Sequence, residues 1–335
     1  MKRTVLSCIQ PGEWKFYEED LPSLKQGEAL LKIKKVGICG TDIHAFGGTQ
    51  PYFNYPRILG HEIAAEVLEV SGHDSIEKGD LVTVIPYLNC GTCLACRTGK
   101  PNCCSSINVI GVHSDGAFAT HLIVPSKALL KASGLNTTQL ALVEPLAIGA
   151  HGVRRANVKE GEWVLVMGAG PIGIAAIEFA KIAGAKIAVI DFNEERLHFC
   201  LESLKVDAII NPSTEDVVAS ITNLTGGDMM EVVIDATGNK KAMEAAVGYL
   251  GHGGRIVLIG LQKESLSYSH PEFHKRETTL MSSRNATQED FDWVLQSLAN
   301  GTIKPENYVT GEMLFAQVPD QFTKISGIKT LIDIS

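Results

Sequence analysis

Residues 163–173 read WVLVMGAGPIG, an apolar run followed by three glycines in the spacing Gly-x-Gly-x-x-Gly. The run Trp163–Met167 predicts a buried strand, and the apolar stretch Pro171–Ala183 that follows the glycines predicts a helix. A second apolar run, Lys186–Ile190, comes after that helix. Short apolar runs connected through helices are typical of βαβ units in a parallel sheet. This part of the chain is therefore predicted to be α/β.

Each glycine of this turn has a separate physical role. Gly168 permits the tight turn, Gly170 lets backbone amides approach a pyrophosphate, and Gly173 lets helix and strand pack closely. Pro171 and Ile172 begin the helix, whose N-terminus favours an anion. With a strand before it and a helix after it, the turn predicts a dinucleotide-binding site.

Asp191, at the end of the second strand, indicates which dinucleotide is bound. Its carboxylate is placed to accept hydrogen bonds from the adenosine ribose hydroxyls, and its charge would repel a 2′-phosphate. We therefore expect NAD rather than NADP. Arg196 could instead meet a 2′-phosphate, although beside Glu194 and Glu195 it fits a solvated helix residue better.

The rest of the chain suggests two domains, for which 335 residues suffice. Up to about residue 145, short β-like runs such as Ala29–Val36 and Ile63–Val70 are separated by glycine, proline and aspartate, as in an antiparallel barrel. The tail from about residue 288 has a helical pattern and then the strand-like Thr330–Ile334, and we expect it to return to the first domain. The predicted domains are residues 1–147 with 285–335, and residues 148–284.

Composition excludes several classes of partner. Hydrophobic residues make up 45% and charged residues 20%, as in folded globular proteins, and the net charge of −8 argues against a nucleic-acid footprint. The apolar run near the N-terminus stops at Gln10-Pro11-Gly12 and is too short for a secretion signal. No apolar run is long enough to cross a membrane. We expect a cytoplasmic protein with a small-molecule substrate and no membrane partner.

Five of the eight cysteines fall in residues 89–104, NCGTCLACRTGKPNCC. In a reducing compartment such a cluster more often binds metal than forms disulfides. Four of them have the spacing C-x2-C-x2-C-x7-C, namely Cys90, Cys93, Cys96 and Cys104. Four thiolates satisfy a tetrahedral zinc and leave no open position, which predicts a structural zinc. Cys103 is a bystander or exchanges with Cys104, and an iron–sulfur cluster is the less favoured alternative.

A second candidate metal site lies upstream of this lobe. Cys39 is isolated from the other cysteines, and His61 with Glu62 follows a glycine at the start of a predicted strand. Sulfur, imidazole and carboxylate ligands from separate segments, with one position open, describe a catalytic zinc.

These motifs occur together in one family. The chain resembles the zinc-containing medium-chain alcohol dehydrogenases over essentially its whole length, in the order Gly37–His44, Gly60–Glu62, the cysteine lobe, Val143-Glu144-Pro145 and the glycine turn. The resemblance implies a GroES-like antiparallel β-barrel catalytic domain and a Rossmann domain with a doubly wound parallel sheet. It also implies two zinc ions per subunit, and a homodimer or homotetramer with an edge strand near Arg255–Leu261 at the interface.

The resemblance further implies roles for individual residues. Cys39 and His61 would ligate the catalytic zinc, Asp42 would orient a ligand, and either Glu62 or Glu144 would be the carboxylate that completes or exchanges at the metal. The sequence does not rank these two glutamates.

A proton relay is implied by the same likeness. The zinc would lower the pKa of a secondary alcohol, Thr41 would receive its proton, and His44 would pass the proton to solvent while hydride moves to NAD.

Within the family, the chain most resembles the bacterial L-galactonate and L-gulonate 5-dehydrogenases, which oxidise a sugar acid to a ketouronate. The stretches that carry this likeness are Thr41–Pro51, Val84–Tyr87, Val109–His113, Asp235–Asn239, Pro271–Thr279 and Ser283–Thr287. L-threonine 3-dehydrogenases and polyol dehydrogenases are the alternatives. The former commonly have Gly-His before the cysteine lobe, where this chain has Tyr87-Leu88-Asn89.

A sugar-acid substrate requires a cation for its carboxylate. Arg284 and His113 are the hypotheses, with Lys275 and Arg276 behind them, although each also fits a structural or surface residue. A relative that has lost its metal chemistry and only binds ligands is disfavoured, because the candidate zinc ligands and relay residues are present.

Overall fold

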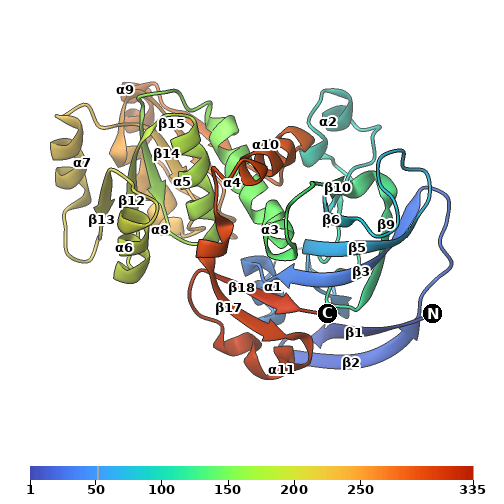
Figure 1. Cartoon of the computed structure of the whole chain (residues 1–335). Coiled ribbons are helices and arrows are strands. Elements are labelled where there is room, and N and C mark those ends of the chain that lie inside the picture. The colour runs from blue at the N-terminus through green and yellow to red at the C-terminus, as the bar shows by residue number, and fades with distance from the viewer. Residues whose placement is uncertain (51–52, 335) are drawn as a thin grey trace. The chain divides into compact units, whose positions relative to one another are not determined.

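The computed structural model describes residues 1–50 and 53–334, and the chain forms two compact units (Figure 1). The first unit comprises Met1–Pro145 and Thr287–Ser335, and the second comprises Leu146–Ala286. Pro51, Tyr52 and Ser335, which fall inside the predicted segments 1–147 and 285–335, lie outside the described residues. None of the helices in the described ranges is both long and apolar enough to cross a membrane.

The second unit is built on a six-stranded parallel sheet in the order β13-β12-β11-β14-β15-β16. Its strands are β11 (Trp163–Met167), β12 (Lys186–Ile190), β13 (Ala208–Ile210), β14 (Met230–Asp235), β15 (Leu250–Leu258) and β16 (Thr279–Ser282). The order reverses between β11 and β14, and in doubly wound sheets ligands bind at the carboxyl ends of the strands at such a reversal. The predicted doubly wound parallel sheet is confirmed.

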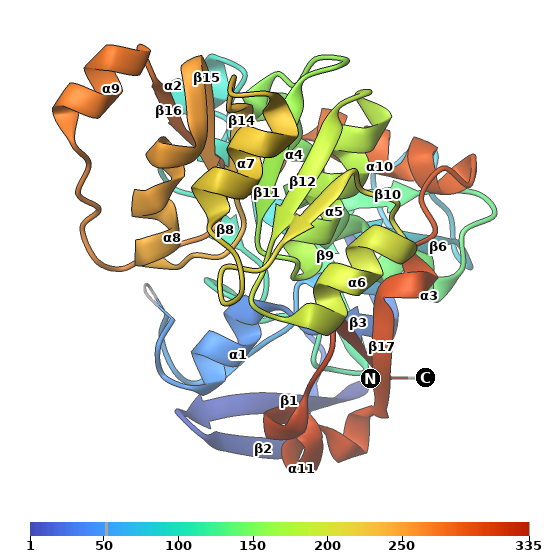
Figure 2. The same ribbon diagram turned by 90° about the vertical axis from the view of Figure 1, so that its left-hand side faces the viewer.

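Helices cover both faces of this sheet. They are α5 (Pro171–Ile182), α6 (Glu194–Glu202), α7 (Val217–Thr225), α8 (Lys240–Ala245) and α9 (His270–Arg276), with the 3-10 turn η3 (Ala246–Tyr249) and α4 (Val143–Ala156), which begins in the first unit. Figure 2 shows this unit with α6 and α7 toward the viewer. Leu165 packs in one cluster with Ile221 of α7, whereas its neighbour Val164 points to the opposite face, and both are fully buried. Burial on both faces explains why these strands are continuously apolar.

One expectation about this sheet was wrong. The stretch near Arg255–Leu261 was expected to be an edge strand, but β15 pairs with β14 on one side and with β16 on the other. The free edge on that side is therefore β16, because the chain adds one more strand after β15.

The first unit is mainly antiparallel. Its strands are β1 (Lys2–Gln10), β2 (Glu13–Asp20), β3 (Glu28–Gly37), β4 (Arg57–Ile58), β5 (Glu62–Val70), β6 (Leu81–Val84), β7 (Tyr87–Leu88), β8 (Asn108–Val109), β9 (His121–Pro125), β10 (Leu129–Lys131), β17 (Val309–Leu314) and β18 (Lys329–Asp333). Its helices are α1 (Gly40–Phe46), α2 (Leu94–Arg97), α3 (Thr137–Ala141), α10 (Gln288–Ala299) and α11 (Val318–Gln321), with short 3-10 segments η1 (Pro101–Cys103), η2 (Ser126–Ala128), η4 (Pro305–Tyr308), η5 (Phe315–Gln317) and η6 (Phe322–Lys324).

Strand β3 organises the larger sheet of this unit. One of its edges pairs with β5, and its other edge pairs first with β9 and then with β18 from the C-terminal segment. The last pair between β3 and β5 joins Gly37 to Glu62. The segment that follows β3 and the segment that leads into β5 therefore lie at the same end of the sheet. The first carries Cys39 and the second carries His61.

Candidate metal and dinucleotide sites

The four cysteines of the lobe converge on one point in the first unit. The sulfurs of Cys90, Cys93, Cys96 and Cys104 lie within 4.8 Å of one another, and the exposed Cys103 is not in this group. Cys93 caps the N-terminus of α2, and Cys104 directly follows η1. Sulfurs about 2.3 Å from a central zinc would fit within this spacing.

Hydrogen bonds favour the thiolate form at two of these sulfurs, Cys90 and Cys93. The Cys90 amide donates to the Cys104 sulfur (3.3 Å), and the Cys93 amide donates to the Cys90 sulfur (3.4 Å). Hydrogen bonds from Thr92 lower the pKa of Cys90 to about 7, and those from Cys96 and Ser105 lower the pKa of Cys93 to about 5. The thiolate is the form that binds metal, so the lobe suits a zinc ion.

A second group of metal donors lies in the same unit. One ligand atom each from Cys39, His61 and Glu62 lies within 4.8 Å of the other two. Cys39 caps the N-terminus of α1, and His61 and Glu62 stand where β5 begins. His61 is 4% exposed and Glu62 is fully buried. The structure thus brings together the three donors predicted from separate stretches of sequence.

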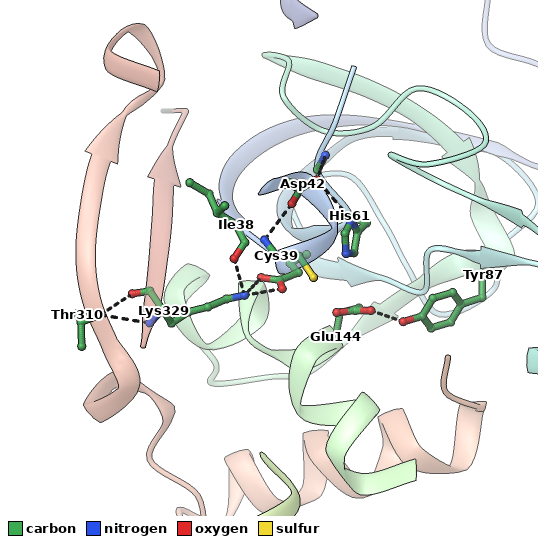
Figure 3. A network of polar contacts seen from close by, with 10 residues as sticks. Ile38, Cys39, Asp42, His61, Tyr87, Glu144, Thr310 and Lys329 are labelled. Carbon is green, nitrogen blue, oxygen red and sulfur yellow. Dashed lines mark hydrogen bonds and ion pairs between the residues drawn. The ribbon is translucent and has the colours of Figure 1, made fainter. Parts of the chain in front are cut away.

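Asp42 connects the two ligand segments. Its carboxylate accepts hydrogen bonds from the amides of Cys39 (2.9 Å) and Gly60 (3.2 Å). One of its oxygens also lies 3.8 Å from Nδ1 of His61 (Figure 3). Asp42 therefore fixes where Cys39 and His61 stand relative to each other.

Two glycines are required beside these ligands. At Gly37, a Cβ atom would lie 1.8 Å from Oε2 of Glu62, so any side chain there would displace the carboxylate. Gly60 has φ +92°, and a Cβ there would lie 2.6 Å from the ring of Phe118. The Gly-His-Glu motif thus includes a glycine because the backbone turns sharply against a buried ring just before the ligands.

Glu144 lies at the start of α4 and is nearly buried, at 4% exposed. Its carboxylate accepts a hydrogen bond from the hydroxyl of Tyr87, as Figure 3 shows. Burial raises the pKa of Glu144, and the charge of Glu62 raises it further. Glu144 is not in the group of three donors, so the structure separates the two glutamates that the sequence could not rank.

Sequence reasoning missed Lys329, which lies in β18 and is 3% exposed. Its ammonium forms a buried ion pair with Glu62 and donates to the carbonyl of Ile38 (3.0 Å). Burial would lower the pKa of Lys329, but the carboxylate of Glu62 and the thiol of Cys39 raise it. A single lysine at the start of an apolar strand was the only sequence signal of this pair.

The thiol, imidazole and carboxylate of Cys39, His61 and Glu62 are groups that bind zinc, and their surroundings favour a positive charge. Nδ1 of His61 is buried and faces the Asp42 carboxylate at 3.8 Å, and among the described residues it has no partner within hydrogen-bond distance. Burial would lower the pKa of His61, but Asp42 and Cys39 raise it well above its usual range. The pocket therefore attracts positive charge to a place where sulfur, nitrogen and oxygen donors meet, as at zinc sites.

The predicted relay residues lie on α1, directly after Cys39. Thr41 is half-buried and His44 is exposed, and a spacing of three residues puts them on one face of the helix. Nδ1 of His44 is 2.8 Å from the hydroxyl oxygen of Thr49, which also donates to the His44 carbonyl (3.3 Å). If the Thr49 hydroxyl donates its proton to that carbonyl, Nδ1 is the donor to Thr49 and Nε2 is the acceptor.

The glycine turn in the second unit has the geometry of a dinucleotide site. Gly168 has φ +96°, and a Cβ on Gly173 would lie 1.8 Å from the Gly168 carbonyl oxygen. Gly170 caps α5, and Pro171 is the first residue of that helix, followed by Ile172. The helix N-terminus thus faces the reversal of strand order, where an anion is stabilised.

Asp191 follows β12 and helps to hold the turn. Its carboxylate accepts hydrogen bonds from the amides of Ala169 (2.7 Å) and Asn193 (2.8 Å). A carboxylate has about four acceptor positions, so it can still accept bonds from a ribose. Arg196 lies in the first turn of α6, close to Gly170.

The candidate substrate residues belong to both units. His113 is exposed in the first unit, and its Nδ1 accepts a hydrogen bond from the Val109 amide (3.0 Å). Arg276 donates to the Leu250 carbonyl (3.2 Å) and pairs with Glu272, which indicates a structural role. Lys275 is in the same helix, α9, and Arg284 is exposed after β16.

A doubly wound dinucleotide sheet and a unit with a sulfur, imidazole and carboxylate cluster together define a metal-dependent dehydrogenase. Residues 25–134 match the alcohol dehydrogenase GroES-like domain, and residues 171–300 match the zinc-binding dehydrogenase domain. The chain belongs to the family of zinc-type alcohol dehydrogenases. It is an oxidoreductase of the class that acts on CH–OH groups, as predicted.

Individual relatives agree with this assignment. The chain is 46% identical to the L-galactonate-5-dehydrogenase of Escherichia coli K12, covering 96% of this chain and 94% of that protein. It is 34% identical to the L-threonine 3-dehydrogenase of Pyrococcus horikoshii, covering 78% and 76%. It is also similar to a solved structure from E. coli CFT073, described as a short chain alcohol dehydrogenase complexed with NADH, with a TM-score of 0.93, 30% identity and 99% coverage of both chains.

We predict that Gly173→Ala and Gly170→Ala act on different properties. Gly173→Ala places a methyl group against the Gly168 carbonyl and should lower the free energy of unfolding by about 1–3 kcal/mol in denaturant titrations. At Gly170 the nearest atom to a Cβ is 4.0 Å away, so Gly170→Ala should keep its stability. That methyl group should instead weaken NADH binding at least about tenfold in a fluorescence titration, since backbone approach to the pyrophosphate is blocked. Equal stability of the two variants would contradict this reading.

We also predict that Lys329→Met destabilises the protein strongly. It leaves the buried charge of Glu62 without a partner, which should cost about 3–5 kcal/mol in denaturant unfolding at equal zinc content. Lys34→Met is the control, because Lys34 and Glu66 form a partly exposed pair (2.8 Å) worth about 1 kcal/mol or less. The account of the buried pair fails if both variants lose the same small amount.

Proposed function

We propose that this protein uses NAD to oxidise the C5 hydroxyl of a hexonate, L-galactonate or L-gulonate, to a ketouronate. The observation that carries the proposal is the 46% identity to an L-galactonate-5-dehydrogenase across 96% of the chain. The donor group Cys39, His61 and Glu62 supports it, because the chemistry needs a metal with an open position.

In this proposal, Cys39, His61 and Glu62 hold the catalytic zinc, and the four cysteines of the lobe hold a structural zinc. When bound, the catalytic zinc supplies a Lewis acid for the substrate hydroxyl, and NAD supplies the hydride acceptor. The choice of NAD is supported by Asp191 at the end of β12 and by the relative that was solved with NADH. Asp42 keeps the sulfur and imidazole donors in place.

The residues of α1 handle the proton in this proposal. Thr41 receives the proton of the substrate hydroxyl, and His44 takes it up on Nε2 because its Nδ1 is engaged with Thr49. His44 is exposed, so it can release the proton to solvent. The half-buried Thr41 and exposed His44 thus form a path from the interior outward.

The hexonate carboxylate requires a cation, and we retain Arg284 for this role, with His113 as a second candidate. Arg276 is the weaker choice, since it is paired with Glu272 and bonded to the Leu250 carbonyl. The alternative function is that of an L-threonine 3-dehydrogenase, favoured by 34% identity to one over 78% of the chain. The residues Tyr87-Leu88-Asn89, where those enzymes commonly have Gly-His, weigh against it.

The substrate assignment predicts a clear order of activities. Across L-galactonate, L-gulonate, L-threonine, sorbitol and simple alcohols, NADH formation should favour a hexonate by at least about tenfold in kcat/KM, because the site must match several hydroxyls. A preference for threonine or sorbitol would defeat the assignment.

The proposed proton relay makes a separate prediction. Thr41→Val should lower kcat by about 10²–10⁴ and leave the zinc content unchanged.

A further inference from the structure

The two buried glutamates beside the metal donors are restrained by different partners. Glu62 pairs with the ammonium of Lys329, which also donates to the Ile38 carbonyl. Glu144 accepts a hydrogen bond from the neutral phenol of Tyr87. Two carboxylates that look alike in sequence are therefore held by a cation in one case and by a neutral hydroxyl in the other.

Tyr87 is itself held firmly. It begins β7 and pairs with Val109 of β8, so its backbone is fixed within a small sheet. The residue is 8% exposed, and its ring packs edge-on against Phe291 of α10, with ring centroids 6.3 Å apart. The hydroxyl therefore approaches Glu144 from a defined direction (Figure 3).

This hydrogen bond limits what Glu144 can do. A phenol that donates to a buried carboxylate forms a charge-assisted bond, which Glu144 must break before that oxygen can bind a metal. Glu62 is also held, by Lys329, but in that position one of its oxygens already lies in the group with Cys39 and His61. The geometry thus ranks the two carboxylates, which the sequence alone leaves equal.

We propose that Tyr87 is a positioning residue that holds Glu144 away from the metal, so that Glu62 is the carboxylate ligand and the remaining position stays open for substrate. This inference rests on the metal set of the proposed function. It adds that the hydroxyl of Tyr87, rather than a low intrinsic affinity of the Glu144 carboxylate, keeps Glu144 from coordinating.

The test replaces zinc with cobalt(II), whose visible absorption reports the ligands and the coordination number. Four proteins are compared: wild type, Tyr87→Phe, Glu144→Gln and the double variant. The signal from the cysteine lobe is recorded on Cys39→Ser and subtracted. Tyr87→Phe keeps the ring that packs against Phe291 and removes only the hydroxyl, so folding is preserved.

If Tyr87 restrains Glu144, the Tyr87→Phe variant gains a ligand. Its cobalt absorption should weaken as the coordination number rises, and its catalytic-site metal should resist a chelator at least about tenfold better than that of wild type. The double variant should return to the spectrum and chelator resistance of Glu144→Gln, because the entering carboxylate is gone. If Tyr87 had only a structural role, removing its hydroxyl would change the spectrum and the chelator resistance equally with and without Glu144.

Two results would overturn the role of Tyr87 alone: a Tyr87→Phe spectrum identical to that of wild type, or a change that persists in the double variant. A wild-type protein with no Cys39-dependent cobalt signal would overturn the metal set itself, and the role of Tyr87 with it. The two failures are therefore distinguishable in one series of spectra.

Discussion

The carboxylate of Asp42 is the contact on which the group of metal donors in the first unit depends. It is fully buried, and it accepts from the amides of Cys39 and Gly60 while facing His61. Burial raises its pKa, and the charge of His61 and the two amides act against that shift and favour the ionised form. Because one carboxylate serves both ligand segments, the sulfur and imidazole donors have a defined separation before any metal arrives.

In both units, the candidate functional residues lie next to the ends of strands. In the first unit, β3 ends beside the start of β5, and the C-terminal β18 adds Lys329 next to them. In the second, the reversal of strand order between β11 and β14 presents the glycine turn and the start of α5. Charged residues from segments far apart in sequence are thereby brought together, and the hydrogen-bonded sheets hold them in place.

Sequence reasoning succeeded where the chemistry is local. The glycine turn and the doubly wound sheet follow from short-range patterns, and the four clustered cysteines do converge in the structure. It failed for Lys329 and Tyr87, whose partners lie 267 and 57 residues away in the chain. No local pattern encodes such pairs, and the ranking of Glu62 against Glu144 depends on both of them. The edge of the parallel sheet was also misplaced, because the strand-like run before Ser283 was not recognised as β16.

The central claim is that the chain has two metal centres with separate duties, and the zinc content of two variants tests it most directly. Cys39→Ser and Cys93→Ser are each measured for zinc per chain, thermal stability and turnover. The account predicts that each loses one zinc: Cys39→Ser keeps its stability and loses turnover, whereas Cys93→Ser loses stability first. A Cys93→Ser protein with full stability and no turnover would contradict the account.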